Sequence, residues 1–196
     1  MTKPTDPHPQ QIPSRVSDID WDRWEPVDRA TLLFVVQQDR VLLIHKKRGL
    51  GAGYLNGPGG RLDPGESPID CAVREVREEL RIVPADPRQM GQLKFQFLDG
   101  YSIHVWVFTS AEFEGVPTET DEAVPVWTPT DAIPYDKMWE DDRIWLPLLL
   151  NNRKFSGKFV FDRTLMLDHL LTEVDPTADS ALAGFEKDSS GDLYHD

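Results

Sequence analysis

A glycine-rich segment runs directly into a capped amphipathic helix near the middle of the chain. Residues 49–60 hold six glycines, a density that indicates a loop with positive φ or close backbone approach. Ser67 then stands at the N-cap position, Pro68 at the first helical position and Asp70 in the capping-box position. Apolar residues follow at helical spacing: Ile69, Val73, Val76 and Leu80. The pattern predicts a loop followed by a helix that Pro84 ends.

Strand-like runs flank this unit on both sides. Apolar runs at 31–36 and 41–44, separated by a polar turn, predict a hairpin. After the helix the chain predicts strands at 93–97, 103–108 and 124–127, a helix at 142–150 that contains Pro147, and a closing strand pair at 159–161 and 165–167. This order predicts an α+β domain with mixed sheets rather than a βαβ repeat.

Charge and composition exclude several classes of protein. The 196 residues carry a net charge of −13, which argues against a basic nucleic-acid-binding surface and against a polybasic membrane anchor. The single cysteine, Cys71, cannot form an intramolecular disulfide, which favours a reducing compartment. No apolar run approaches the roughly 20 residues that span a bilayer, and the N-terminus lacks the apolar core of a signal peptide. We therefore expect a cytoplasmic protein that binds neither membranes nor nucleic-acid polymers.

The acidic residues are concentrated in two segments. Residues 115–142 hold eight acidic residues and one lysine, and residues 173–196 hold seven and one, so these segments account for the whole net charge. The second segment contains few large apolar residues, which is typical of a solvated tail. We expect a proline-rich, flexible N-terminal tail at 1–26, one domain at 27–174, and a disordered acidic tail at 175–196. Trp21 and Trp24 of the first tail can still pack onto the domain.

Three glutamates share one face of the central helix. Glu75, Glu78 and Glu79 lie at positions i, i+3 and i+4, roughly opposite the apolar stripe. Three carboxylates this close repel one another unless a cation lies between them, and hard divalent cations prefer carboxylate oxygen. The alternative is a solvated face that the neighbouring arginines neutralise: Arg74, Arg77 and Arg81.

The spacing of the loop and helix residues resembles the Nudix box of the Nudix hydrolases. Five residues separate Gly60 from Glu66, seven more lead to the run 74–79, and Ile82 closes 23 matching positions. One position departs, because Arg81 stands where the family has a glycine; we expect a changed exit from the helix rather than lost catalysis. The resemblance implies a Nudix fold, with mixed sheets sandwiched between helices as α/β/α.

The resemblance also implies roles for the acids of the box. Glu75, Glu78 and Glu79 would face the metal, expected to be Mg²⁺ with Mn²⁺ as a substitute. Either Glu78 or Glu79 would accept a proton from the attacking water. Glu66 matches the loop acid, and Arg74 matches the arginine that orients the acids by ion pairing.

Three further residues complete the expected metal and phosphate site. Glu122, in the first acidic segment, matches a metal-facing acid outside the helix. Gly59 belongs to the same metal-binding set, and Gly59 and Gly60 would let the backbone approach the phosphates. The implied reaction is hydrolysis of a nucleoside diphosphate linked to another group.

Outside the box the chain resembles one branch of the family, the oxidised purine nucleoside triphosphatases. The similarity extends from about residue 30 to residue 174, and its motifs are the runs 46–53, 56–57, 138–142 and 147–150 together with Trp145. Leu50, Leu55 and Pro58 replace aromatic residues of that branch, and the loop between Phe97 and Ile103 is shortened. We expect Leu50 to line or adjoin the base pocket.

Aromatic and amide side chains among these motifs predict a purine pocket. Trp139 offers a stacking face, Phe95 and Phe97 lie on the same side of one strand, and Asn56 supplies a donor and an acceptor for a purine edge. Taken singly, the phenylalanines and the tryptophan are explained more simply as core residues. Their occurrence together with the box favours the pocket.

Two adjacent aspartates are expected to read the base. If Asp141 and Asp142 are held in one pocket, the pKa of one rises, so that it donates a hydrogen bond while the other accepts one. Such a pair can accommodate both 8-oxo-dGTP and 2-hydroxy-dATP. Taken alone, Asp142 is most simply the N-cap of the following helix. Thr31 and Lys46 also match pocket-lining positions of the branch.

These observations predict a monomeric enzyme that hydrolyses oxidised purine nucleoside triphosphates to the monophosphate and pyrophosphate. A first alternative is a Nudix hydrolase for a methylated purine nucleotide, a nucleotide sugar or a dinucleotide. A second is a nucleotide-binding sensor without turnover, against which the intact glutamates of the box argue.

Overall fold

The computed structural model describes residues 13–174 of the chain. Its elements are, in chain order, the 3₁₀ turn η1 (Val16–Asp18), β1 (Asp28–Gln37), β2 (Arg40–Lys46), β3 (Leu55–Asn56), α1 (Pro68–Leu80), β4 (Ile82–Ala85), β5 (Arg88–Phe97), β6 (Ser102–Ser110), β7 (Glu112–Gly115), β8 (Ala123–Pro129), the 3₁₀ turn η2 (Tyr135–Lys137), α2 (Asp142–Leu150), β9 (Lys154–Asp162) and β10 (Leu165–Val174).

Eight of the strands form one mixed sheet. The order across it is β10, β9, β5, β6, β1, β2 and β3, and β8 pairs with β2. The pairs β1–β6 and β5–β9 are parallel, and the remaining pairs of this sheet are antiparallel. The α+β class and the mixed sheet are confirmed.

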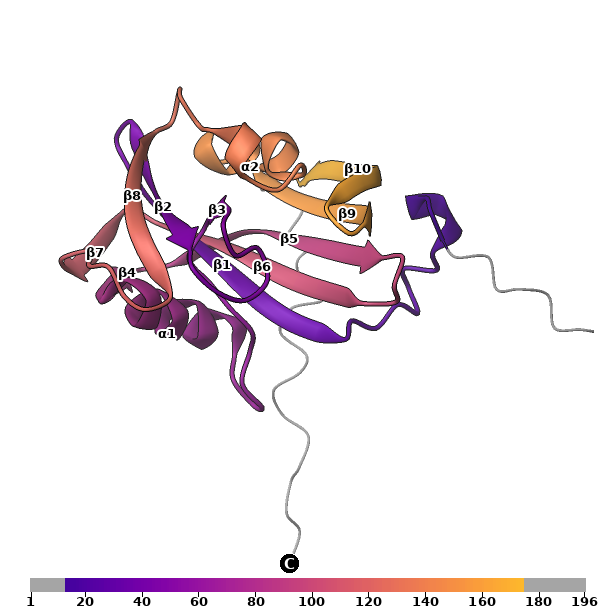
Figure 1. Cartoon of the computed structure of the whole chain (residues 1–196), viewed down its shortest axis with the longest axis horizontal. Coiled ribbons are helices and arrows are strands. Elements are labelled where there is room, and N and C mark those ends of the chain that lie inside the picture. The colour runs from indigo at the N-terminus through magenta and orange to yellow at the C-terminus, as the bar shows by residue number, and fades with distance from the viewer. Residues whose placement is uncertain (1–12, 175–196) are drawn as a thin grey trace, which may run out of the picture.

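The two helices cover opposite faces of this sheet (Figure 1). Side chains of a strand alternate between the faces, so Phe34 of β1 packs on one side with Trp145 of α2, at 5.8 Å between ring centroids. Its neighbour Leu33 is buried on the other side with Val76 of α1. The expected α/β/α sandwich is confirmed, and each face of the sheet has its own core.

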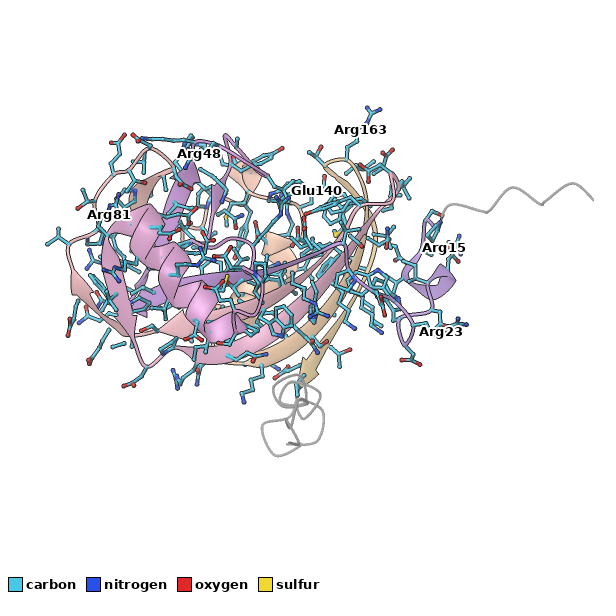
Figure 2. The ribbon with its side chains drawn as sticks, turned by 90° about the horizontal axis from the view of Figure 1, so that it is seen from below. Arg15, Arg23, Arg48, Arg81, Glu140 and Arg163 are labelled. Atoms are coloured by element: carbon cyan, nitrogen blue, oxygen red, sulfur yellow. The ribbon has the colours of Figure 1, made fainter. Side chains whose placement is uncertain are left out.

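Helix α1 begins as the sequence predicts and ends earlier. Ser67 accepts a hydrogen bond from the Asp70 amide at 3.3 Å, and Pro68 opens the helix. The helix stops at Leu80 and not at Pro84, which lies inside β4. Arg81, at the end of α1 in Figure 2, adopts the left-handed conformation with φ 62° and ψ 26°. The expectation that Arg81 changes how the chain leaves the helix is wrong, because this arginine adopts the left-handed conformation that glycine favours at such a position.

Short strands account for most of what the periodicity missed. The two residues of β3 pair with β2, and β4 pairs with β7 in a separate two-stranded sheet. Strands of two to four residues are too short to show an alternating pattern. The closing pair β9–β10 is confirmed and extends well beyond the predicted residues.

Part of the segment expected to be a flexible N-terminal tail packs on the sheet. Val16 is buried, and its amide donates to Asp168 of β10 at 2.8 Å. Trp24 donates from Nε1 to Gln96 of β5 at 2.9 Å, and the Trp21 ring lies 5.4 Å from the ammonium of Lys158. Residues 1–12 of the tail expected at 1–26, and the whole tail expected at 175–196, lie outside the described residues. Among residues 13–174 there is no helix long and apolar enough to cross a membrane.

Candidate active site

A cavity of about 390 Å³, lined from the sheet, the glycine-rich segment, α1 and the start of α2, brings together most of the expected site residues. It is lined by Thr31, Lys46, Asn56, Gly59, Gly60, Glu75, Glu79, Phe95, Phe97, Glu122, Trp139, Asp141 and Asp142. Of the expected residues, Glu66, Arg74 and Glu78 do not line it. The acidic helix face and the aromatic wall therefore meet in one space.

Glu79 is the most buried acid of the box. Its side chain is 1% exposed, and each oxygen has a donor: Lys46 Nζ at 3.2 Å and the Gly59 amide at 2.9 Å. Burial raises the pKa of Glu79, and the attraction of Lys46 works against that rise. A carboxylate held in this way favours a nearby cation.

Two glycines bring the loop against the strand and the helix. A Cβ at Gly59 would lie 2.0 Å from the Thr31 carbonyl oxygen, and one at Gly60 would lie 2.3 Å from the carboxyl carbon of Glu75. At Gly59 the obstacle is backbone, so no side chain fits there, whereas a side chain at Gly60 would displace the carboxylate of Glu75. The glycines therefore serve first to close the loop onto β1 and onto the carboxylate of Glu75.

Arg74 connects the acids of the loop with those of the helix. It forms two parallel hydrogen bonds with Glu66, at 2.7 and 2.8 Å, and contacts Glu75 at 2.8 Å and Glu78 at 3.3 Å. The hydrogen bonds from Arg74 lower the pKa of Glu66 to about 2. In Glu75, burial raises the pKa despite the same arginine. The contacts are those expected of an arginine that orients the acids.

Glu78 differs from its two partners on the helix. Its side chain is 54% exposed and lines a separate surface depression, although its spacing places it on the same helix face. Glu122 lines the main cavity and pairs with Arg48. Helical spacing predicts the face but not the depth at which each carboxylate lies, because depth depends on the loop that covers the helix.

The donor set suits a hard divalent cation. Carboxylate oxygens and the Gly59 carbonyl are oxygen ligands of the kind that Mg²⁺ and Mn²⁺ accept. Burial raises the pKa of both Glu75 and Glu79, because it makes their charged forms less favourable. A bound cation would stabilise these charged forms. Within residues 13–174 no three acidic, histidine or cysteine side chains are already gathered as a metal cluster; Glu79 and Glu122 are paired with basic residues instead.

Asp141 and Asp142 line the cavity from the start of α2, whereas Glu75 and Glu79 line it from α1, which covers the opposite face of the sheet. Asp141 is 4% and Asp142 is 2% exposed. Asp141 accepts from Trp145 Nε1 at 2.8 Å, and Asp142 accepts from the Trp139 amide at 3.1 Å. Burial raises the pKa of both carboxyls, and the neighbouring charge of Asp141 raises that of Asp142 further.

The simple N-cap explanation for Asp142 is wrong. Helix α2 starts at Asp142 itself, with Asp141 at the N-cap, and no side-chain hydrogen bond caps the helix. Both residues line the cavity, and in each carboxyl group one oxygen accepts from a tryptophan N–H.

Aromatic rings form the wall next to this pair. Phe95 stacks on Phe159 at 5.2 Å, and the Trp139 ring meets Phe161 edge-on at 5.9 Å. Phe95 and Phe97 therefore both line the cavity and pack against the core. Of the three departures from the branch, Leu50 lines the cavity and is 49% exposed, as expected, whereas Leu55 and Pro58 are buried.

Sequence reasoning missed several residues of the cavity. Phe161, Arg61 and Tyr101 line it, and Trp145 holds Asp141. The alternation of β9 contains a signal for Phe161, since Phe159 and Phe161 point to one face. Nothing in the sequence brings Tyr101, in the β5–β6 turn, beside Arg61, which directly follows the glycine-rich segment.

Comparisons with known proteins agree with this geometry. The NUDIX domain model matches residues 26–149. Proteins named oxidized purine nucleoside triphosphate hydrolase from Mus musculus and Danio rerio are 42% and 41% identical over 147 residues, covering 74% of this chain and 94% of each relative. A crystal structure of a MutT protein from Bacillus halodurans superposes with a TM-score of 0.68 at 27% identity, over 74% of this chain and 97% of that one. With the box, the sandwich and the family match in agreement, the chain belongs to the Nudix family.

Proposed function

We propose that this protein hydrolyses oxidised purine nucleoside triphosphates, 8-oxo-dGTP and 2-hydroxy-dATP, to the monophosphate and pyrophosphate. The observation that carries the proposal is the buried pair Asp141–Asp142, at the end of a cavity whose other end holds Glu75 and Glu79. One end offers polar groups for a base, and the other offers carboxylates for a metal-bound polyphosphate. The names of the two vertebrate relatives support the same substrate class.

In this proposal the aspartates read the purine edge. Two adjacent, buried carboxyl groups do not readily both ionise. One therefore keeps its proton and donates a hydrogen bond to the base, while the other accepts a hydrogen bond from it. Moving the proton between them exchanges donor and acceptor, which lets one pocket take a keto or an amino purine. Asn56 adds an amide to the same cavity, and Trp139 adds a ring face for stacking.

The glutamates form the catalytic end. Glu75, Glu78, Glu79 and Glu122, with the Gly59 carbonyl, are the proposed ligands of Mg²⁺, for which Mn²⁺ can substitute. A bound ion would polarise the phosphate oxygens and lower the pKa of the attacking water. Arg74 holds Glu66, Glu75 and Glu78 in place.

The acceptor of the proton from water is one of two glutamates. Both oxygens of Glu79 already accept hydrogen bonds, from Lys46 and from Gly59. Glu78 meets Arg74 through one oxygen only. Glu78 therefore has the freer oxygen, and Glu79 has the more fixed position.

A panel of nucleotides tests the proposal. Release of pyrophosphate with Mg²⁺ should be fastest for 8-oxo-dGTP and 2-hydroxy-dATP and slower for dGTP and dATP. Faster turnover of a methylated purine nucleotide, a nucleotide sugar or a dinucleotide would replace the substrate and keep the reaction class. Binding without turnover of any nucleotide would make the protein a sensor.

The remaining expectations on setting belong to this proposal. We propose a monomer that acts in the cytoplasm on the free nucleotide pool. The buried free thiol of Cys71 is consistent with a reducing compartment. Size-exclusion chromatography with light scattering, and fractionation of cells, test the two statements.

A further inference from the structure

Gln96 lies directly behind the aromatic wall of the cavity. Phe95 and Phe97 line the cavity, and because side chains of a strand alternate, Gln96 points to the opposite face of β5. On that face lies the segment 13–26, which Arg15 and Arg23 mark in Figure 2. Most of this segment precedes residue 26, where the match to the Nudix domain begins.

The amide of Gln96 holds the two ends of the β5–β6 turn together. Its Nε2 donates to the carbonyl of Phe97 at 3.0 Å and to the carbonyl of Tyr101 at 3.1 Å. Both of these residues line the cavity, and their rings lie 5.6 Å apart. Gln96 therefore adds two side-chain hydrogen bonds to a turn that the backbone also closes, through the Phe97 amide and the Tyr101 carbonyl at 2.9 Å, and it helps to hold two residues whose rings line the cavity.

The indole N–H of Trp24 donates a hydrogen bond that fixes the orientation of this amide. Gln96 can present its NH₂ group to two carbonyls only with its oxygen turned the other way, and there the indole N–H of Trp24 donates to it at 2.9 Å. Trp24 is itself held by the Trp21 ring at 5.3 Å and by the ammonium of Lys94 at 5.5 Å. Without this N–H, the oxygen would be a half-buried acceptor with no donor in these contacts, and the amide would be less firmly held on the turn.

We propose that Trp24 is a positioning residue for substrate recognition, which sets the purine pocket through Gln96 and the β5–β6 turn. The inference rests on the proposed nucleotide substrate, and it adds a residue from outside the matched domain to the determinants of affinity. Its effect falls on the base end of the cavity, because the hydrogen bonds and ring contacts described for Trp24 and Gln96 involve none of the glutamates that line the cavity.

A matched pair of variants tests the proposal. Trp24→Phe and Trp21→Phe each remove one indole N–H from the same segment; in Trp21 this N–H donates to the Val16 carbonyl at 2.8 Å, within the segment itself. Both variants are expected to lower the thermal midpoint. Only Trp24→Phe should raise KM for the preferred purine triphosphate, by about fivefold, the effect of losing one ordinary hydrogen bond, with kcat unchanged.

A double-mutant cycle with Gln96→Met makes the test specific. Gln96→Met also removes the two hydrogen bonds to the turn, so it should raise KM at least as much as Trp24→Phe. The double variant should be no worse than Gln96→Met alone, because Trp24 acts through Gln96. A wild-type KM in Trp24→Phe, an equal rise in Trp21→Phe or additive effects would each overturn the proposal. If the wild-type protein turns over no purine triphosphate, the proposed function itself fails, which is a different result.

Discussion

Among single residues, Asp141 gives the sharpest test of base recognition. Asp141→Asn keeps the shape and an oxygen for the Trp145 indole, but it removes the shared proton of the pair. Selectivity for 8-oxo-dGTP over dGTP should fall by about tenfold or more, since a mismatched buried polar contact costs roughly 1–3 kcal/mol. Ratios of kcat/KM for the two nucleotides measure it. Asp136→Asn, at an exposed position of η2, is the control, and unchanged selectivity in Asp141→Asn would contradict the pairing.

The ion pair between Glu66 and Arg74 makes a pH-dependent contribution to stability. The folded pKa of Glu66 is about 2, below its ordinary value of 4.5, so the folded state binds this proton more weakly than the unfolded state. The stabilisation is therefore fully present above pH 4.5 and is lost as pH falls toward 2. In urea unfolding, Glu66→Gln should cost about 1–2 kcal/mol at pH 6, after solvent screening, and progressively less toward pH 3. A constant difference across this range would rule out the linkage.

Residue types and spacing predicted which side chains line the cavity. They predicted less well how deeply each of these side chains is buried and which partner it contacts. The box placed Glu75 and Glu79 correctly because a helix fixes the direction of each residue. It could not separate buried Glu79 from exposed Glu78, since the difference arises from the loop at Gly59 and Gly60 folding over one side of the helix. Trp145 was visible in the sequence only as part of a motif, because its bond to Asp141 depends on where α2 begins.

At the scale of elements, the end of α1 offers a stability test. Arg81 has φ 62°, and an L-residue with a side chain pays roughly 1–2 kcal/mol for the left-handed conformation. Arg81→Gly should therefore raise the free energy of unfolding by about 1 kcal/mol, somewhat less than the full penalty because glycine is more flexible when unfolded. Arg81→Ala keeps the unfavourable φ and should show no such gain. Stabilisation by both variants alike would instead point to the charge of the arginine.

Long elements with a clear period were predictable, and elements made by contact were not. The hairpin β1–β2, helix α1 and the closing pair β9–β10 follow from apolar patterns and turn residues. The small sheet of β4 and β7 forms between residues about thirty positions apart, and neither strand has enough residues to show a period. The packing of residues 13–26 had only Trp21 and Trp24 as a signal, within a segment otherwise typical of a tail.

At the scale of the whole molecule, an acidic protein is proposed to bind a polyanion. Lys46 and Arg48 line the cavity, but each is paired with an acid, Glu79 and Glu122. Added cations are therefore needed to neutralise the site and a triphosphate together. We expect an excess of chelator to abolish hydrolysis of 8-oxo-dGTP, and Mg²⁺ or Mn²⁺ to restore it, as measured by pyrophosphate release.

The fold should survive the chelator, because Lys46–Glu79 and Arg74–Glu75 pair the buried acids without a metal, so circular dichroism should stay unchanged. Full turnover in the presence of the chelator would contradict the metal dependence, whereas unfolding would show that these ion pairs do not replace the cation.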